Sequence, residues 1–252
     1  MSETMAFTRP RSLADRVTHY CPGCQHGIGQ RLVAECLDEM NLADNTIAVT
    51  SIGCSVFLYD YLLVDSVEAP HGRAPAVATG VKRARPDNFV FTYQGDGDLA
   101  SIGMAEIMHA ANRGERISVV FVNNTIYGMT GGQMAPTTLV GQKTTTCPSG
   151  RCAATEGQPF RMAEIMAGLG GVAYSTRVAL NNVKHINQAK KAVRRAFEVQ
   201  LKNQGLGFVE LLATCPTNWK MNPLEANERI AKELIPYFPL GVFKDVKEGG
   251  QC

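Results

Sequence analysis

The sequence lacks any apolar run long enough to span a membrane, and its first ten residues lack the apolar core of a secretory signal. An excess of charge is also missing, because 25 Lys and Arg stand against 23 Asp and Glu. A nucleic-acid binder would concentrate positive charge on one patch, whereas the basic residues here are scattered along the chain. We therefore expect a cytoplasmic protein with no membrane and no nucleic acid among its partners.

Repeats, low-complexity tracts and long linkers are absent as well, so we expect residues 1–252 to form a single domain with extensions at both ends. A chain of this length, with 45% hydrophobic residues, can bury a full core without disulfide staples. In a reducing cytoplasm its eight cysteines are not expected to form four disulfides. The closely spaced Cys21 and Cys24 indicate metal or redox chemistry instead.

Short apolar runs alternate with longer amphipathic segments along the chain. Strands are expected at residues 46–50, 89–93, 117–122, 172–176 and 208–212, and helices at 26–40, 99–113, 159–168 and 183–203. This alternation predicts an α/β fold, a parallel sheet with helices on both faces. Residues 127–158 are rich in Gly and Thr and fit no element, and a loop of that length is typical of a segment that covers a site.

Polar motifs follow two of the predicted strands. Gly95, Asp96, Gly97 and Asp98 come after the strand at 89–93, and Asn123 and Asn124 come after the strand at 117–122. Parallel strands joined by a right-handed crossover end at the same edge of the sheet, so Asp96 and Asn124 can meet there. Their carboxylate and amide oxygens suit Mg²⁺, which completes its shell with phosphate oxygens and water. Gly-Asp-Gly is also a common turn, and the order of the surrounding elements is what favours a site.

The common nucleotide-binding motifs are missing. No Gly-x-Gly-x-x-Gly opens a helix after a strand and no Gly-x-x-x-x-Gly-Lys-Ser/Thr occurs, so NAD and ATP are not expected. The turn around Asp96 and the Asn123-Asn124 pair instead resemble the motif that binds thiamine diphosphate. That resemblance implies that Asp96, Asn124 and the main-chain oxygen of Ile126 hold Mg²⁺ against the diphosphate.

Cys21 and Cys24 have the spacing that lets two thiolates face one metal. Spacing alone does not choose two further ligands among Cys36, Cys54, Cys147, Cys152, Cys215 and Cys252. Cys36 lies in an apolar helical pattern and is expected in the core. By ligand count, four thiolates fit Zn²⁺ and an iron–sulfur cluster equally well.

The motifs taken together resemble the thiamine-binding β subunit of 2-oxoacid:ferredoxin oxidoreductases. They lie at residues 21–24, 51–55, 71–73, 95–98, 123–124, 127–133 and 214–219, and the resemblance runs from about residue 20 to about residue 245. It implies the diphosphate-binding domain of thiamine diphosphate enzymes, with a 4Fe-4S cluster on Cys21, Cys24, Cys54 and Cys215. It also implies oxidative decarboxylation of a 2-oxoacid to acyl-CoA and CO₂, with electrons passed through the cluster to ferredoxin. Cys147 and Cys152 are left without a role, as simple loop cysteines or a local redox or metal pair.

The same resemblance implies which residues form the site. The coenzyme is expected against Gly53, Cys54, Ser55, His71, Gly95, Asp96, Gly97, Asp98, Asn124, Ile126, Gly128, Met129 and Thr130, and catalytic roles are expected for Ser55, His71, Arg73 and Thr130. Some relatives that bind a second carboxylate carry Lys where this chain has Gly131, which weighs against a dicarboxylate. Branched-chain 2-oxoacids such as 2-oxoisovalerate and 2-oxoglutarate are the favoured substrates, with pyruvate behind them.

The resemblance covers only the diphosphate-binding half of a thiamine enzyme. It therefore implies an α subunit that supplies the pyrimidine-binding domain, while a γ subunit and a ferredoxin-like δ subunit can join, since the chain lacks the dense cysteine run of a ferredoxin. Two other functions stay open. One is a non-oxidative thiamine diphosphate enzyme with incidental cysteines, and the other is a zinc-stapled structural or electron-transfer partner.

Overall fold

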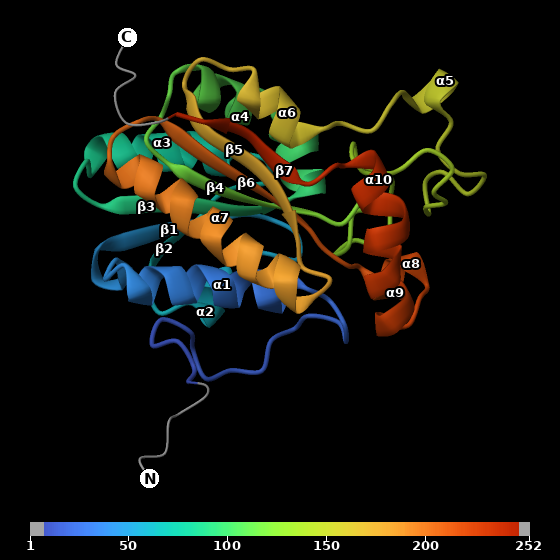
Figure 1. Cartoon of the computed structure of the whole chain (residues 1–252), viewed down its shortest axis with the longest axis horizontal. Coiled ribbons are helices and arrows are strands. Elements are labelled where there is room, and N and C mark those ends of the chain that lie inside the picture. The colour runs from blue at the N-terminus through green and yellow to red at the C-terminus, as the bar shows by residue number, and fades with distance from the viewer. Residues whose placement is uncertain (1–7, 247–252) are drawn as a thin grey trace.

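One seven-stranded sheet organises the computed structural model, which describes residues 8–246 (Figure 1). The strands lie in the order β2-β1-β3-β4-β6-β5-β7. Their bounds are β1 Thr46–Thr50, β2 Asp65–Glu68, β3 Phe89–Gly95, β4 Ser118–Asn123, β5 Val172–Ala179, β6 Leu206–Leu212 and β7 Gly241–Asp245. All neighbours run parallel except β5 and β7, which pair antiparallel. The predicted α/β fold is confirmed, and β7 corrects the expectation of a purely parallel sheet.

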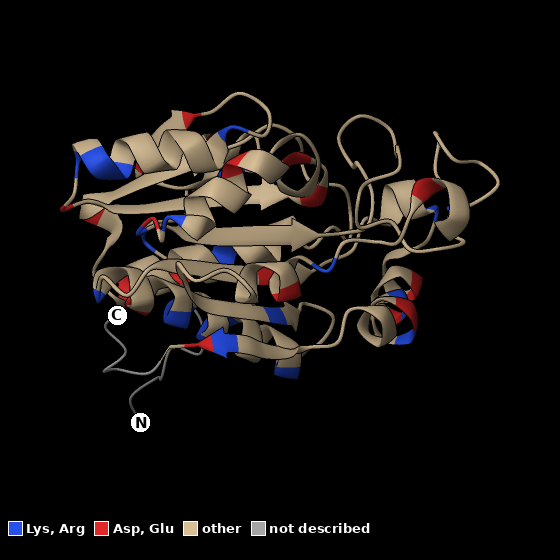
Figure 2. Cartoon of the chain, turned by 90° about the horizontal axis from the view of Figure 1, so that it is seen from above, with Lys and Arg blue, Asp and Glu red and all other residues tan. Residues whose placement is uncertain are grey.

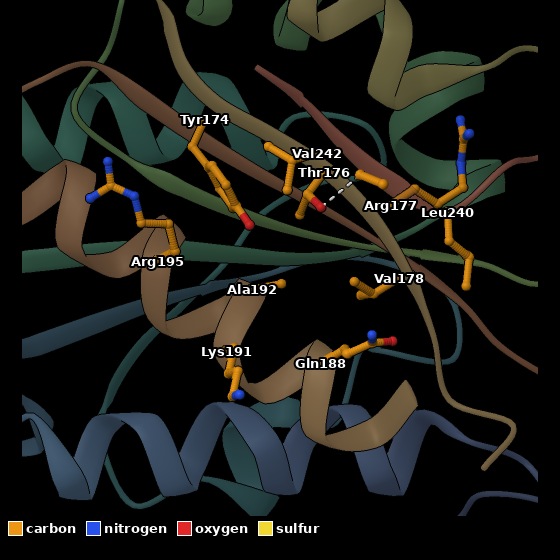
Figure 3. Close-up of a pocket in the computed structure, with 11 residues that line it drawn as sticks. Tyr174, Thr176, Arg177, Val178, Gln188, Lys191, Ala192, Arg195, Leu240 and Val242 are labelled. Carbon is orange, nitrogen blue, oxygen red and sulfur yellow. Dashed lines mark hydrogen bonds between the residues drawn. The ribbon is translucent and has the colours of Figure 1, made fainter. Parts of the chain in front are cut away.

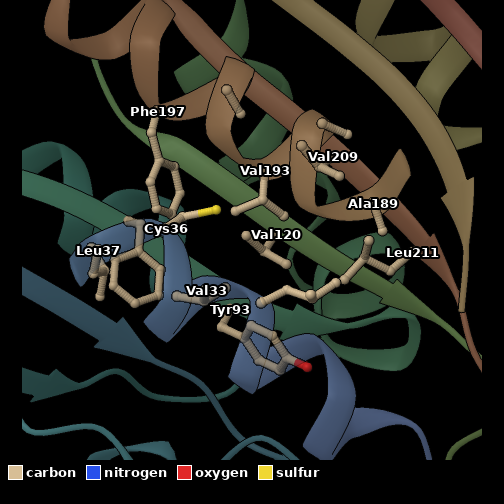
Figure 4. Close-up of a cluster of buried hydrophobic side chains, with 14 of the residues drawn as sticks. Val33, Cys36, Leu37, Tyr93, Val120, Ala189, Val193, Phe197, Val209 and Leu211 are labelled. Atoms are coloured by element: carbon tan, nitrogen blue, oxygen red, sulfur yellow. The ribbon is translucent and has the colours of Figure 1, made fainter. Parts of the chain in front are cut away.

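Helices cover both faces of the sheet, as parallel strands require because they are apolar on both sides. On one face lie α1 (His26–Glu39) and α7 (Val183–Leu201), and on the other lie α3 (Ala74–Ala84), α4 (Met104–Asn112) and α6 (Met162–Ala167). Figure 4 shows the first of the two cores, where side chains of α1 and α7 meet those of the central strands. Cys36 is fully buried in this core, as predicted.

The C-terminal helices stand at one end of the sheet, beyond β6 (Figure 1). They are α8 (Pro216–Trp219), α9 (Pro223–Arg229) and α10 (Ile235–Tyr237), and a separate apolar cluster packs them against Leu139 of the long loop. Two further short helices are α2 (Leu58–Tyr61) and α5 (Ala153–Glu156). Within residues 8–246, no helix combines the length and the apolar character that crossing a membrane requires.

Most central elements begin within two residues of their predicted positions, and the differences have local causes. The helix predicted at residues 99–113 is divided, because Asp98–Ile102 forms a π-helical turn before α4. The edge strand β2 was missed because its four residues are largely exposed and lack an apolar pattern. The helix α3 was also missed. The predicted terminal extensions include residues 1–7 and 247–252, and with them Cys252, which lie outside the described residues.

Charged residues of both signs are spread over the helices and strand ends (Figure 2). On α7, Lys190 lies 2.6 Å from Glu39 of α1, and Arg195 lies 2.7 Å from Asp245 of β7. A groove of about 450 Å³ runs along this edge between α7 and strands β5 and β7 (Figure 3). Thr176 Oγ1 in β5 donates a hydrogen bond to the main-chain oxygen of Gly241 in β7 at 2.8 Å. The contacts of Arg195 and Thr176 attach the antiparallel strand β7 to α7 and β5.

An ion pair inside the sheet joins Arg177 of β5 to Glu210 of β6, and both side chains are completely buried. Arg177 Nε lies 2.9 Å from Glu210 Oε2, and the guanidinium also contacts Glu164 of α6. Asn123 Nδ2 donates to Glu210 Oε1 at 2.7 Å, so the network reaches the turn that follows β4. Removing one partner of such a pair leaves the other charge buried and uncompensated.

We expect Arg177→Met to lower the free energy of unfolding by about 3 to 5 kcal/mol, because Glu210 would lose its buried cation. Urea unfolding followed by circular dichroism measures the change. Arg16→Met is the matched control, since Arg16 pairs with Asp60 while its side chain is 63% exposed. That loss should change the free energy of unfolding by less than about 1 kcal/mol. Equal losses in the two variants would contradict the assigned role of the buried network.

Candidate active site

The carboxyl ends of β1, β3, β4 and β6 meet at one edge of the sheet. Because β3 lies between β1 and β4 with all three parallel, the loops that follow them emerge side by side. The loops that follow β1, β2, β3 and β4 line a pocket of about 140 Å³. Most of the predicted coenzyme residues line it, namely Gly53, Cys54, His71, Gly95, Asp96, Gly97, Asp98, Asn124, Ile126, Gly128, Met129 and Thr130. The sheet edge therefore brings together residues that are up to 77 positions apart in the sequence.

Asp96 is buried at the end of β3, with only 2% of its surface exposed. Its Oδ1 accepts a hydrogen bond from Gly97 N at 2.8 Å, and its Oδ2 accepts one from Thr137 Oγ1 at 2.5 Å. Burial raises the pKa of this carboxyl to about 7, and the hydrogen bonds oppose that rise. Within residues 8–246 no Lys, Arg or His forms an ion pair with it. The carboxylate is thus oriented and desolvated, and it lacks a cation from this part of the chain.

Asn124 faces the same pocket from the turn after β4. Its Oδ1 accepts a hydrogen bond from Ile126 N at 3.2 Å. Between them Thr125 adopts a left-handed conformation with φ of 60°, which is uncommon for a β-branched residue. The main-chain N–H groups of Asn124 and Thr125 also favour the ionised form of Asp96 and oppose the effect of burial on its pKa. Asp96 and Asn124, predicted to meet, lie on the same pocket wall.

Asp98 lines the pocket, but its carboxylate is held by hydrogen bonds from other residues of the protein. Its buried carboxylate accepts hydrogen bonds from His71 Nδ1 at 2.5 Å, Gly72 N at 2.7 Å, Gln94 Nε2 at 2.5 Å and Ser51 Oγ. Four donors therefore hold one carboxylate, and one of them is the imidazole of His71. A carboxylate on Nδ1 fixes the tautomer of a neutral histidine and leaves Nε2 as an acceptor.

Two predicted catalytic residues lie outside the pocket lining. Arg73 immediately precedes α3 and forms an ion pair with Glu106 of α4. Ser55 is 1% exposed, and its hydroxyl donates to the main-chain oxygen of Ser51 at 3.5 Å. In this structure both residues support the loops around the pocket.

Two glycines allow close approaches that a side chain would prevent. A Cβ atom at position 97 would stand 2.3 Å from the ring of Tyr127. At position 128 it would stand 3.0 Å from Cys54 Sγ and 3.5 Å from Cys215 Sγ. In the described part of the chain, no atom beyond the adjacent residues comes within 4 Å of the corresponding position at Gly53 or Gly95, so open space faces the backbone there. The pocket wall is therefore bare backbone at several points, as a diphosphate group requires.

The four cysteines predicted as cluster ligands come from the turn before α1, the turn after β1 and the residue before α8. All four are free thiols. Burial raises the pKa of Cys24 and Cys54 to about 12, and it raises the pKa of Cys215 as well. Cys21 lies close enough to add to all three shifts. Among the described residues, no three His, Cys, Asp or Glu side chains are spaced to hold a single metal ion.

Two threonines of the long loop contact both turns that face the pocket, and the sequence reasoning missed them. Thr137 donates to Asp96 Oδ2, while Thr138 Oγ1 donates to the main-chain oxygen of Thr125 at 2.6 Å. Gln142 Nε2 donates to the same oxygen at 3.0 Å. The loop was expected to cover a site. Its first part lines the pocket, and residues 137–142 brace the turns that carry Asp96 and Asn124.

Arg151 fixes this bracing segment. It is 5% exposed, and its guanidinium donates to six main-chain oxygens, those of Ala135, Pro136, Thr138, Glu156, Gly157 and Gln158, at 2.7 to 3.3 Å. Three of these oxygens flank Thr137. A segment without regular structure leaves its carbonyl groups unpaired, and a buried arginine satisfies several of them at once.

Comparison with known proteins identifies the family. Residues 51–211 match the family described as "Thiamine pyrophosphate enzyme, C-terminal TPP binding domain". The 2-oxoglutarate synthase subunit KorB of Methanocaldococcus jannaschii is 40% identical over 205 residues, which cover 81% of this chain and 72% of that relative. The chain belongs to the family of 2-oxoacid:ferredoxin oxidoreductase β subunits. The family predicted from the motifs is confirmed.

Other members of this β-subunit family are more similar in sequence but longer. The ketoisovalerate oxidoreductase subunit VorA of Methanothermobacter thermautotrophicus is 47% identical over 239 residues, which cover 95% of this chain and 50% of VorA. The chain therefore spans about half the length of that relative. Among solved structures, the 2-oxoglutarate:ferredoxin oxidoreductase from Magnetococcus marinus matches with a TM-score of 0.76 and 24% identity. The match covers 98% of this chain and 87% of the other, and it shows that the fold is shared.

We expect Thr137→Val to weaken the binding of thiamine diphosphate by about 10- to 100-fold, because Asp96 would lose a hydrogen-bond donor that orients it. Titration calorimetry of the purified protein with thiamine diphosphate and MgCl₂ measures the affinity. Thr137→Ser keeps the hydroxyl and is the matched control, with affinity near that of the parent protein. An unchanged affinity in the valine variant would show that the bond does not orient Asp96.

Proposed function

We propose that the chain is the β subunit of an enzyme that oxidatively decarboxylates a 2-oxoacid to acyl-CoA and CO₂ and passes the electrons through a 4Fe-4S cluster to ferredoxin. The observation that carries this proposal is the approach of Cys54 and Cys215 to Gly128. The two sulfur atoms lie 3.0 and 3.5 Å from where a Cβ atom of residue 128 would stand, on the turn that lines the coenzyme pocket.

The residues at the sheet edge fit thiamine diphosphate and Mg²⁺. A desolvated carboxylate without a cationic partner, an amide oxygen beside it and open space at Gly53 and Gly95 are what a diphosphate-bound Mg²⁺ requires. Asp96, Asn124 and the main-chain oxygen of Ile126 would hold the ion. The chemistry that thiamine diphosphate supplies when bound is a carbon nucleophile for the keto group and a sink for the electron pair released with CO₂.

We propose that the four thiols hold an iron–sulfur cluster. Cys21, Cys24 and Cys215 each contribute electrostatically to the raised pKa of Cys54, so the four sulfur atoms lie near one another. Their raised pKa values mean that thiolates need metal charge nearby to form at neutral pH. Cys21, Cys24, Cys54 and Cys215 would hold the cluster, which supplies one-electron transfer.

The remaining pocket residues orient neighbouring side chains or accept protons. Asp98 holds the imidazole of His71, so that Nε2 can accept a proton from a group entering the pocket. Thr130 contributes a hydroxyl and lies next to Met129 at the pocket rim. Arg73 and Ser55 do not line the pocket. We propose that they affect catalysis indirectly, by supporting the loops around the pocket.

A partner is proposed to close the pocket. Met129 lines the pocket with 48% of its surface exposed, and Ile102, 49% exposed, lies against Gly72, next to the pocket residue His71. Exposed apolar residues at such a rim are typical of a subunit interface. We propose that an α subunit binds there and supplies the pyrimidine-binding domain. A γ subunit, a ferredoxin-like δ subunit and ferredoxin itself are proposed as further partners. A cytoplasmic location stays a prediction.

For the substrate we propose a branched-chain 2-oxoacid such as 2-oxoisovalerate first, and 2-oxoglutarate second. The ketoisovalerate and 2-oxoglutarate subunits named above support these two classes. Gly131 has open space where a side chain would begin, and no cation occupies that position to bind a second carboxylate. This supports the branched-chain substrate.

The metal and coenzyme content tests the proposal against its alternatives. Anaerobically purified protein is expected to contain about four iron and four sulfide per chain, together with thiamine diphosphate, and to reduce an artificial acceptor when a 2-oxoacid and coenzyme A are added. A colourless protein with thiamine diphosphate would support a non-oxidative enzyme. Zinc without thiamine diphosphate would support a structural or electron-transfer partner. Either result would overturn the oxidative function.

The two cofactor sites are also expected to be separable by mutation. Asp96→Ala should abolish Mg²⁺-dependent thiamine diphosphate binding while the cluster absorbance stays, because the only charged oxygen ligand is lost. Cys24→Ala should bleach the cluster and stop acceptor reduction. Absorbance spectra and coenzyme content measured on both variants check this. Loss of both cofactors in both variants would indicate misfolding rather than two distinct sites.

A further inference from the structure

The coenzyme pocket has a second histidine in its wall besides His71. His26 begins α1 two residues after Cys24, and it lines the same pocket as Gly53 and Cys54. Only 2% of its surface is exposed. The sequence motifs gave no sign of a role for it. A buried imidazole therefore faces the space in which thiamine diphosphate is proposed to bind.

Two tyrosine rings hold the imidazole of His26 in place. Tyr20 stacks on it, with ring centroids 5.1 Å apart and an angle of 12° between the planes, and the ring of Tyr93 lies 5.7 Å away. Tyr93 fits against α1 because residue 29 is glycine, where a Cβ atom would stand 2.6 Å from the Tyr93 hydroxyl. The orientation of the imidazole is thus fixed by packing between aromatic rings.

The Nδ1 atom of His26 is buried and has no hydrogen-bond partner within residues 8–246. Both neighbouring tyrosines use their hydroxyl groups elsewhere. Tyr93 donates to the main-chain oxygen of His26 at 3.2 Å, and Tyr20 accepts a hydrogen bond from Gln30 Nε2. A buried polar atom without a partner destabilises a fold, so such atoms are rare. An unpaired nitrogen on the wall of a pocket therefore indicates a partner that arrives with the ligand.

We propose that His26 positions thiamine diphosphate by donating a hydrogen bond from Nδ1 to an oxygen atom of the diphosphate. The inference rests on the proposed function and adds a residue to its coenzyme site. Since the proposed α subunit binds the pyrimidine end, the thiazolium ring and the diphosphate are left for this pocket, and the diphosphate carries the oxygen atoms that accept hydrogen bonds. Open space at Gly53, in the same pocket, allows that group to approach. A neutral imidazole has one N–H group to donate.

The test compares two variants of the assembled, coenzyme-free enzyme that separate the nitrogen atom from the ring. His26→Phe keeps a ring for stacking on the tyrosines and removes the nitrogen. Titration calorimetry with thiamine diphosphate and MgCl₂ should show an affinity at least about tenfold lower, the loss of one charge-assisted hydrogen bond. His26→Asn removes the ring and places an amide donor near the position of Nδ1, so its affinity should stay within about threefold of the parent value. His109→Phe is the matched control with unchanged affinity, because His109 is exposed on α4.

Two further measurements separate a contact with the diphosphate from a purely structural role. Because His26→Phe removes an unsatisfied buried atom, this variant without coenzyme should unfold at a temperature no lower than that of the parent enzyme. Calorimetric titration with inorganic pyrophosphate and MgCl₂ should show the same fold loss of affinity in this variant as titration with thiamine diphosphate.

Four results would overturn the inference while the proposed function stands. They are parental coenzyme affinity in His26→Phe, an equal loss in His26→Asn, unfolding of His26→Phe at a lower temperature than the parent, and a pyrophosphate affinity that is the same in His26→Phe and the parent. A parent enzyme with no affinity for thiamine diphosphate overturns both the inference and the proposed function.

Discussion

The carboxylate of Asp96 is buried at the end of a central strand without a cation from the described chain, and much of the surrounding structure acts on this one group. An isolated charge in such a place is unstable, which is why its pKa rises to about 7. Hydrogen bonds from Gly97, Thr137 and the turn after β4 hold it in one orientation. They cannot replace a counter-charge. A site arranged in this way is preorganised for a cation that arrives with its own anionic ligand.

Parallel strands explain why distant parts of the chain converge on that carboxylate. Because β1, β3, β4 and β6 run the same way, the loops that follow them share one edge of the sheet. Helices on both faces and the buried pair of Arg177 and Glu210 keep these strand ends in register. Asn123 links that buried pair to the turn carrying Asn124, so the scaffold and the site are parts of one hydrogen-bonded network. Rigidity at the strand ends is what lets loops present reactive groups with precision.

Sequence reasoning was most successful where the local pattern and the tertiary role coincide. The central strands are apolar runs, and the turn around Asp96 carries its signature in neighbouring residues, so both could be read directly. The edge strand β2 could not be predicted in this way, because it depends on pairing with β1 and has no apolar face of its own. Arg151 and Thr137 were invisible for a related reason. Their role arises from contacts across a loop without periodicity, and no spacing in the sequence predicts which carbonyl or carboxylate they reach.

Gly128 shows how the two kinds of chemistry are brought together. It lines the coenzyme pocket, and the sulfur atoms of Cys54 and Cys215 stand close to where its side chain would begin. Any other residue would place a Cβ atom 3.0 Å from Cys54 Sγ, so the sulfur would have to shift by a few tenths of an ångström. With glycine, the turn that lines the pocket approaches both sulfur atoms without a side chain between them. The proposed transfer of electrons from thiamine diphosphate to a cluster on these cysteines would benefit from that close approach, which the absence of a side chain allows.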